Sequence, residues 1–395
     1  MIETGYPKLT LHPGKDRSLR NRHPWVFSGA IKSKKDSIQE GTLVEVFDCD
    51  GNYLATGHFH HGTIMVRVIS FNQRVIDQHF WNESLQAAVD LRATLGLIKN
   101  SQTDAYRLIH GEGDGLPGLV IDIYGDCAVV QAHSEGMRRS LDAIGNALRN
   151  TPLQLNHIYN KSAEFSDQPA DHPNGWLLGQ AEASVVFENG RRFHVNWKDG
   201  QKTGFFLDQR DNRSLLASYV KDKNVLNTFC YSGGFSIYAL TAGAKHVTSI
   251  DSSKKAIEWI QQNVELNQIA AEKHQAICDD VSSYLKNVKN DAYDVIILDP
   301  PAYAKHLSAV DRAVVGYRNI NELAIRKIKA GGMLFTFSCS QAIDKQLFRK
   351  TVFMAAAKTG RRVRILHQLS QGADHPINLF HPEGEYLKGL VLVVD

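Results

Sequence analysis

Short apolar runs alternate with longer stretches of helical spacing from residue 197 to residue 395. Apolar runs bounded by turn residues predict buried strands, and apolar residues at helical spacing predict helices. Strands are expected at residues 225–229, 247–250, 276–278, 295–298 and 333–337, and Cys278 is expected to be buried in its strand. Their alternation with helices predicts a mostly parallel, doubly wound α/β sheet. Asp208 is expected to cap a helix that begins at Gln209.

The start of the chain has a different pattern. Residues 42–47 and 63–71 are rich in β-branched and aromatic side chains, and Asp50-Gly51-Asn52 is a turn signal between strands. Residues 1–75 are therefore expected to form a small β-rich domain.

The middle of the chain mixes both patterns. Residues 80–97 have apolar positions at helical spacing and predict a linking helix. Further strands are expected at residues 119–124, 128–132, 158–160, 184–188 and 192–195. Residues 76–196 are thus predicted to form a mixed α/β domain, which contains a surface loop at 166–175, and residues 197–395 to form the doubly wound domain.

The composition is that of a globular protein without a membrane segment. Of the 395 residues, 43% are hydrophobic and 22% are charged, and no apolar run reaches the length of a membrane span. The N-terminus lacks a secretory signal pattern, and the five cysteines have no repeated spacing. We therefore expect a cytoplasmic protein with reduced cysteines.

Positive charge is concentrated near the N-terminus, although the net charge is only +3. Between residues 8 and 35 one acid, Asp16, stands against eight basic residues: Lys8, Lys15, Arg17, Arg20, Arg22, Lys32, Lys34 and Lys35. Clustered cations attract phosphate backbones, and the adjacent Trp25 could stack on a base. The segment therefore indicates RNA binding, with a solvated basic face as the alternative.

The stretch from residue 225 to residue 252 forms a strand, a glycine turn, a helix and a second strand that ends in Asp251. Gly233 and Gly234 allow a ligand to approach the backbone closely, and an acid at a strand end can bind ribose hydroxyls. The third glycine of a pyrophosphate-binding turn is missing, which disfavours an NAD-dependent dehydrogenase. The unit suits a nucleoside ligand such as S-adenosylmethionine, or a sheet with no ligand.

Reactive or acidic side chains follow four strands of the predicted sheet: Asp251, Asp280, Asp299 and Cys339. The carboxyl ends of parallel strands meet at one edge, so these side chains should surround one crevice. A helix N-cap could explain any single acid. It does not explain the two prolines after Asp299, whose rigid carbonyls suit the amino edge of a planar base.

Several motifs follow one another in a characteristic order: Asn227-Thr-Phe-Cys-Tyr-Ser-Gly-Gly-Phe, Asp279-Asp280-Val281, Leu298-Asp-Pro-Pro and Phe335-Thr-Phe-Ser-Cys-Ser. Leu207-Asp-Gln-Arg-Asp, Ala373-Asp-His-Pro and Glu383-Gly-x-Tyr-Leu-Lys-Gly accompany them. This set resembles the bacterial ribosomal large-subunit RNA cytosine-C5 methyltransferases that carry an N-terminal PUA domain. The basic opening resembles their PUA domain, and the similarity covers essentially the whole chain.

The resemblance implies a Rossmann-like methyltransferase domain, S-adenosylmethionine as cofactor, 23S ribosomal RNA as partner and a homodimer. The residues implied to hold the cofactor are Gln209, Asn227, Phe229, Tyr231, Gly233, Asp251, Ser252, Asp280, Val281 and Asp299. Asp251 would bind the ribose and Asp280 the adenine amine. Asp299 and the Pro300 carbonyl would orient the cytosine, and Cys339 would be the nucleophile.

The chemistry of C5 methylation requires such a set. C5 of cytosine is a poor nucleophile until a thiolate adds to C6. A free cysteine has a pKa of about 8.5, so Cys339 needs an electropositive, partly exposed setting. Ala302 departs from the family pattern, in which a lysine often follows the prolines. A base contact that relatives make through that lysine has no counterpart at Ala302.

Two other functions remain open on the residues. An exocyclic-amine RNA methyltransferase would use Asp299-Pro300-Pro301 without a cysteine, and a non-catalytic RNA-binding assembly factor would need only the basic segment. No cysteine or carboxylate completes a tetrahedral set with His58, His60 and His61, so no metal site is expected.

Overall fold

The computed structural model describes residues 3–33, 38–165, 173–182, 184–304 and 306–395. Lys34, Lys35 and most of the loop predicted at 166–175 lie outside this part of the chain. The chain folds into two compact units, one of residues 1–186, 195–204 and 373–384, and one of residues 187–194, 205–372 and 385–395. The three domain boundaries proposed above stay a prediction.

A six-stranded sheet opens the first unit, with strand order β2-β6-β5-β4-β1-β3. The elements are β1 (Lys8–Leu11), α1 (Arg17–Arg20), β2 (Trp25–Phe27), β3 (Ile31–Ser33), β4 (Leu43–Phe47), β5 (Tyr53–Phe59) and β6 (Ile64–Ser70). Alternate strand residues such as Leu9, Val44 and Val66 are fully buried and form its core. The predicted β-rich start of the chain is confirmed.

A five-stranded sheet follows in the same unit, with strand order β11-β10-β9-β8-β7. The elements are α2 (Gln78–Thr94), β7 (Ala105–His110), β8 (Leu119–Tyr124), β9 (Cys127–Ala132), α3 (Glu135–Arg139), α4 (Leu141–Arg149), β10 (His157–Asn160) and β11 (Gly175–Leu178). Leu85 of α2, Ile121 of β8 and Ile144 of α4 belong to one hydrophobic core. A two-stranded hairpin, β12 (Ser184–Glu188) and β13 (Arg191–Val195), turns at Asn189-Gly190.

The second unit is built on a seven-stranded sheet with the order β16-β15-β14-β17-β18-β20-β19. Its strands are β14 (Asn224–Thr228), β15 (His246–Asp251), β16 (His274–Cys278), β17 (Tyr293–Leu298), β18 (Ile328–Ser338), β19 (Val363–Ser370) and β20 (Lys388–Val394). The first five strands in sequence, β14 to β18, pair with one another in parallel, whereas β20 pairs antiparallel with both β18 and β19. The predicted mostly parallel sheet is confirmed, and β19 and β20 extend it.

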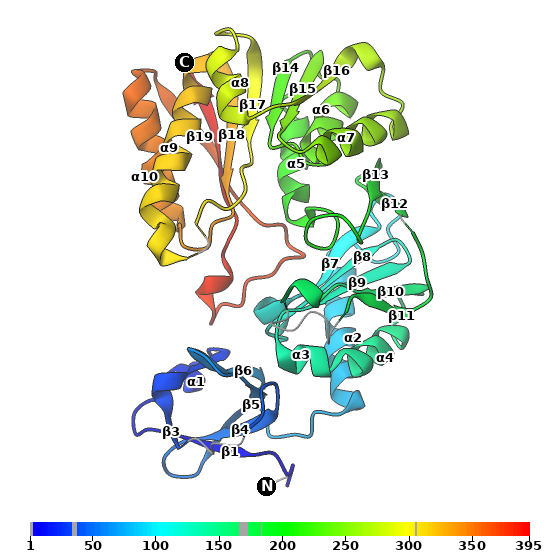
Figure 1. Ribbon diagram of the computed structural model, residues 1–395, viewed down its shortest axis with the longest axis vertical. Coiled ribbons are helices and arrows are strands. Elements are labelled where there is room, and N and C mark those ends of the chain that lie inside the picture. Colours follow the sequence, from blue (N-terminus) through cyan, green and yellow to red (C-terminus); the bar gives the residue numbers. More distant parts are fainter. Residues whose placement is uncertain (1–2, 34–37, 166–172, 183, 305) are drawn as a thin grey trace. The chain divides into compact units, whose positions relative to one another are not determined.

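Helices cover both faces of this sheet (Figure 1). They are α5 (Arg210–Ala217), α6 (Gly234–Thr241), α7 (Lys254–Leu266), α8 (Val281–Asn287), α9 (Val310–Lys327) and α10 (Lys345–Thr359). From β14 the chain first winds outward through β15 and β16 and then winds the other way through β17 and β18. Right-handed crossovers therefore place α6 and α7 on one face and α8 and α9 on the other. None of the described helices is long and apolar enough to span a membrane.

Two local expectations were wrong. Asp208 does not cap a helix: it lies in the 3-10 turn η4 (Leu207–Gln209), α5 begins at Arg210, and the Asp208 carboxylate accepts a hydrogen bond from the Tyr386 hydroxyl at 2.7 Å. Cys278, expected to be buried, is exposed because β16 is an edge strand of the sheet.

A buried ion pair ties the hairpin to α5 in the second unit. Arg213 donates to both carboxylate oxygens of Glu188, at 2.8 and 2.6 Å, and the two side chains are 2% and 0% exposed. Arg213 also donates to the Phe206 carbonyl at 2.9 Å. A carboxylate that loses such a partner stays buried without compensation.

We expect Arg213→Met to lower the free energy of unfolding by about 3–5 kcal/mol, because Glu188 would be left as an unpaired buried charge. Arg326→Met removes one of the two ion-pair partners of Glu322 on the helix surface and should cost less than about 1 kcal/mol. Urea unfolding followed by circular dichroism measures both. The double change Glu188→Met and Arg213→Met should recover most of the loss. Equal losses in the two single variants would contradict the assignment.

Candidate active site

The turn after β14 has an unusual backbone. Phe229 and Tyr231 have positive φ angles of 54° and 48°, and Gly233 has 84°. Side chains at positive φ cost energy and concentrate at ligand sites. A Cβ on Gly233 would come within 2.3 Å of the Ile260 side chain, so only glycine fits there. The turn is held by the Cys230 amide, which donates to the Ile250 carbonyl at 3.0 Å.

Asp251 ends β15 directly beside this turn. Its two carboxylate oxygens accept hydrogen bonds from the backbone N–H groups of Tyr231, at 3.0 Å, and Ser253, at 2.9 Å. Each oxygen can accept a second bond, so the carboxylate is oriented and still able to bind a diol. The Tyr231 ring packs edge-on against Trp259 at 5.4 Å.

The other predicted cofactor residues occupy different positions along this edge. Asn227 is 1% exposed and its amide donates to the Ser236 hydroxyl at 2.8 Å, so its side chain supports the sheet from inside. Ser252 is exposed. Asp280 is also exposed, and its carboxylate caps α8 by accepting from the Ser283 N–H at 2.8 Å. Val281 is buried at the start of that helix.

Asp299 follows β17 and lies next to Gln209. The Gln209 amide donates to Asp299 Oδ2 at 3.1 Å, and its carbonyl oxygen accepts from the Asn212 amide at 2.6 Å. Gln209 is 2% exposed, so the chain Asn212–Gln209–Asp299 is fixed by packing. The Gln209 side chain thus orients the Asp299 carboxylate.

Cys339 follows β18, the strand next to β17. Its thiol lies 4.0 Å from the Pro300 carbonyl oxygen, toward which it can donate a weak hydrogen bond, and the residue is half-buried. Asp299, Pro300 and Cys339 are therefore neighbours at one edge, as predicted. The pairing of Leu298 with Thr336 in the parallel register explains this proximity.

Of the other four cysteines, two are buried and two are exposed. Burial raises the pKa of Cys230 well above its ordinary value and that of Cys127 to about 12. Cys49 and Cys278 are exposed. Cys339 is the partly exposed thiol beside the Pro300 carbonyl.

Three residues around Cys339 were not predicted as functional. The Tyr317 hydroxyl lies 2.9 Å from the Ser340 hydroxyl, and the Ala304 N–H donates to the same oxygen at 3.2 Å. The Lys388 ammonium donates to the Ser340 carbonyl at 2.6 Å. Lys388 lies in the Glu-Gly-x-Tyr-Leu-Lys-Gly motif, and this motif was the available signal.

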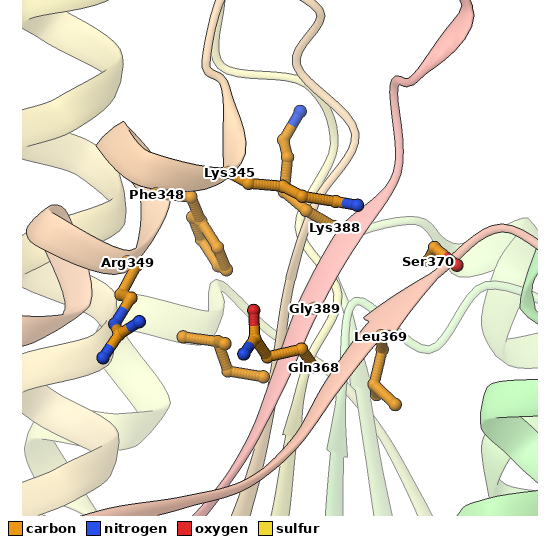
Figure 2. A pocket seen from close by; sticks show the side chains of 9 residues that line it. Lys345, Phe348, Arg349, Gln368, Leu369, Ser370, Lys388 and Gly389 are labelled. Carbon is orange, nitrogen blue, oxygen red and sulfur yellow. The ribbon is translucent and has the colours of Figure 1, made fainter. Parts of the chain in front are cut away.

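A shallow pocket opens near this edge between α10, β19 and β20 (Figure 2). Its lining residues are Lys345, Phe348, Arg349, Gln368, Leu369, Ser370, Lys388, Gly389 and Leu390. Three of them are cationic, and Phe348 and Leu390 provide an apolar floor. A Cβ on Gly389 would come within 2.5 Å of the Phe337 ring, so glycine allows the two strands to pack here.

The predicted RNA-binding residues gather around α1 in the first unit. Lys15 and Arg17 are exposed. Arg20 is paired with Asp16 and with Asp48, the latter at 2.7 Å, so its charge is partly neutralised. Two more residues are held by packing: Arg22 lies 5.1 Å above the Phe71 ring, and Trp25 is half-buried against His381, with ring centroids 4.3 Å apart.

Comparison with known proteins identifies the chain. Residues 9–71 match the PUA-like domain family and residues 108–374 match the S-adenosylmethionine-dependent methyltransferase family. Ribosomal RNA large subunit methyltransferase I of Pseudoalteromonas atlantica is 41% identical over 394 residues, 98% of this chain and 99% of its own length. The same enzyme of Klebsiella pneumoniae strain 342 is 38% identical, with 98% of each chain covered.

The chain belongs to the ribosomal RNA large subunit methyltransferase I family. It is an S-adenosylmethionine-dependent ribosomal RNA methyltransferase, so a non-catalytic assembly factor is excluded. The fold agrees with that of an S-adenosylmethionine-dependent methyltransferase from Streptococcus mutans, with a TM-score of 0.84, 23% identity, and 98% and 100% of the two chains covered. A methyltransferase crystallised with S-adenosylhomocysteine gives 0.86, at 24% identity and the same coverage.

The residues at the edge of β14 and β15 fit the cofactor of the methyltransferase. The oriented Asp251 carboxylate suits the ribose hydroxyls, and Gly233 lets the tight turn beside it pack directly against Ile260. The Ser232 hydroxyl is buried without a hydrogen-bond partner among the described residues, and a polar ligand atom would satisfy it.

We expect Asp251→Ala to raise the Kd for S-adenosylmethionine about 10- to 100-fold, because charge-assisted hydrogen bonds to the ribose would be lost. Isothermal titration calorimetry measures the change. Glu265→Gln removes a negative charge from the exposed end of α7 and should leave the Kd within about twofold. Unchanged affinity in the folded Asp251→Ala protein would remove this residue from the binding site.

Proposed function

We propose that the enzyme methylates C5 of a cytosine in 23S ribosomal RNA through a covalent bond between Cys339 and C6 of the base. The observation that carries this proposal is the half-buried thiol beside the Pro300 carbonyl, at the edge where Asp299 also lies. The names of the relatives, which act on ribosomal RNA of the large subunit, support the substrate class.

The reaction follows from the groups at this edge. The Cys339 thiolate attacks C6, a sulfur–carbon bond forms, and the electrons of the C5–C6 double bond move into the ring, which makes C5 enamine-like. When bound, S-adenosylmethionine would supply the electrophilic methyl group that C5 accepts and would leave as S-adenosylhomocysteine. A base then removes the C5 proton, the double bond re-forms, and the sulfur–carbon bond breaks to return the thiolate.

Asp299 and Pro300 have the geometry to hold the cytosine during these steps. The Pro300 carbonyl can accept from the exocyclic amine, and the Asp299 carboxyl oriented by Gln209 faces the N3 edge in our proposal. In its protonated form Asp299 donates its proton to N3 and stabilises the negative charge that develops there, mainly in the transition state. The base has to be splayed out of its strand to reach this edge.

Two cationic surfaces support binding of the RNA. One is formed by Lys15 and Arg17 in the first unit, and the other by Lys345 and Arg349 at the rim of the pocket in Figure 2. Lys15, Arg17 and Arg349 form no ion pair with a carboxylate among the described residues, and such cations can replace the counterions of phosphates, whereas Lys345 is paired with Glu385. The homodimer expected from the sequence stays a prediction.

We expect Cys339→Ala to abolish methylation, because no thiolate remains to activate C5. Bisulfite sequencing of ribosomal RNA incubated with the enzyme measures the product. Cys49→Ser, which changes an exposed turn residue, should retain full activity. RNA containing 5-fluorocytidine should trap a covalent complex with the native enzyme and none with Cys339→Ala, since C5 then carries no proton to lose.

An active Cys339→Ala enzyme would overturn the covalent mechanism. Product on the exocyclic amine, detected by mass spectrometry of the digested RNA, would favour the alternative that uses only Asp299 and the following prolines.

We expect the double variant Lys15→Ala and Arg17→Ala to bind a ribosomal RNA fragment more weakly than the native enzyme. The magnitude of the slope of the logarithm of the association constant against the logarithm of the salt concentration should fall by about 1–2, the contribution of the lost phosphate contacts. Fluorescence anisotropy at several salt concentrations measures the slope. The control is the double variant Lys223→Ala and Lys289→Ala, which removes the same charge at the edge of the seven-stranded sheet opposite the one that holds Cys339. If both double variants change the slope equally, the effect is one of net charge rather than of a binding surface.

A further inference from the structure

Lys388 is a buried cation at the catalytic edge. It begins β20, is 2% exposed, and pairs across the sheet with Ser338, the residue before Cys339. This register carries its side chain to the segment that holds the nucleophile. A fully buried lysine is rare unless a negative charge or a dense set of acceptors compensates it.

The acceptors around the Lys388 ammonium are neutral. It donates to the Ser340 carbonyl at 2.6 Å and to the Tyr386 carbonyl at 2.8 Å, and it forms no ion pair with a carboxylate of the described residues. Two carbonyls orient the ammonium but do not neutralise it. The positive charge is therefore held against the carbonyl of Ser340, the residue that follows Cys339.

The charged groups near Lys388 come from three segments. Burial lowers the pKa of Lys388 to about 8, and the negative charges of Cys339, Glu385 and Asp344 oppose this shift, with Cys339 contributing most. The positive charge of Lys345 also lowers the pKa of Lys388, but Lys345 is ion-paired with Glu385. On the α9 side, burial raises the pKa of Tyr317, so this hydroxyl stays neutral. Cys339 is thus the main counter-charge available to Lys388.

We propose that Lys388 is a positioning residue whose fixed ammonium keeps Cys339 in the thiolate form. The inference rests on the proposed role of Cys339 as nucleophile. An opposite charge a few ångströms away typically lowers the pKa of an acid by about 1–3 units. The thiol proton leaves to solvent, Lys388 keeps its own protons, and the thiolate is restored when the product is released. Lys388 touches no reacting atom and acts through the sulfur.

The test measures the thiolate directly in the full-length protein. Iodoacetamide alkylates each cysteine at a rate set by its thiolate fraction, and peptide mass spectrometry reports Cys339 separately from the exposed reference thiols Cys49 and Cys278. In Lys388→Met we expect about tenfold slower alkylation of Cys339 at neutral pH, and a pH midpoint about one unit higher. Lys388→Arg should restore the rate to within about threefold. Lys350→Met, which removes an exposed lysine of α10, should leave it unchanged.

The outcomes separate this inference from the proposed function. An unchanged alkylation midpoint of Cys339 in Lys388→Met that still binds S-adenosylmethionine overturns the role of Lys388, even where Cys339→Ala is inactive. An active Cys339→Ala enzyme overturns the proposed function instead, and the alkylation result for Lys388→Met then still holds. If the Lys388 variants do not fold, the native protein decides: a Cys339 midpoint at or above that of Cys278 refutes the inference.

Discussion

The catalytic edge depends on the parallel pairing of β17 with β18. This register sets Leu298 opposite Thr336, so the residues that follow each strand emerge side by side. Asp299 with Pro300 on one strand and Cys339 on the other are then adjacent without any special loop. The antiparallel β20 adds a third contribution from the far side, because its first residue, Lys388, pairs with Ser338. The backbone pairing of β18 with its two neighbours thus assembles an acid, a carbonyl, a thiol and an ammonium.

The cofactor edge is built by a different device. The turn after β14 places Phe229 and Tyr231 at positive φ, and the cost of this conformation is offset by the buried contacts that hold it, among them the hydrogen bond from Cys230 to Ile250. The strained turn directs the Tyr231 N–H at the Asp251 carboxylate. The two edges are therefore built differently: strand register positions Cys339, the nucleophile of our proposal, whereas a strained turn orients Asp251 on the cofactor side.

Much of this could be read from the sequence, because short apolar runs locate strands and parallel strands end at a common edge. That reasoning correctly predicted that Asp299 and Cys339 lie close together at one edge of the sheet. It failed where long-range contacts decide: Asp208 meets Tyr386, which is distant in sequence, and Cys278 is exposed because edge or centre is a property of strand order. Lys388 could not be predicted as a neighbour of Cys339, since β20 itself was not predicted.

The position of β20 has a consequence for how the protein folds during its synthesis. β20 lies between β18 and β19 in the sheet, although it follows both in sequence. While the chain grows on the ribosome, β18 keeps a bare hydrogen-bonding edge and β19 has no strand to join until residues 388–394 have been synthesised. Such open edges invite intermolecular pairing. Nascent chains stalled before this point should therefore be prone to aggregate and to depend on chaperones, even though most of the sheet has already been made.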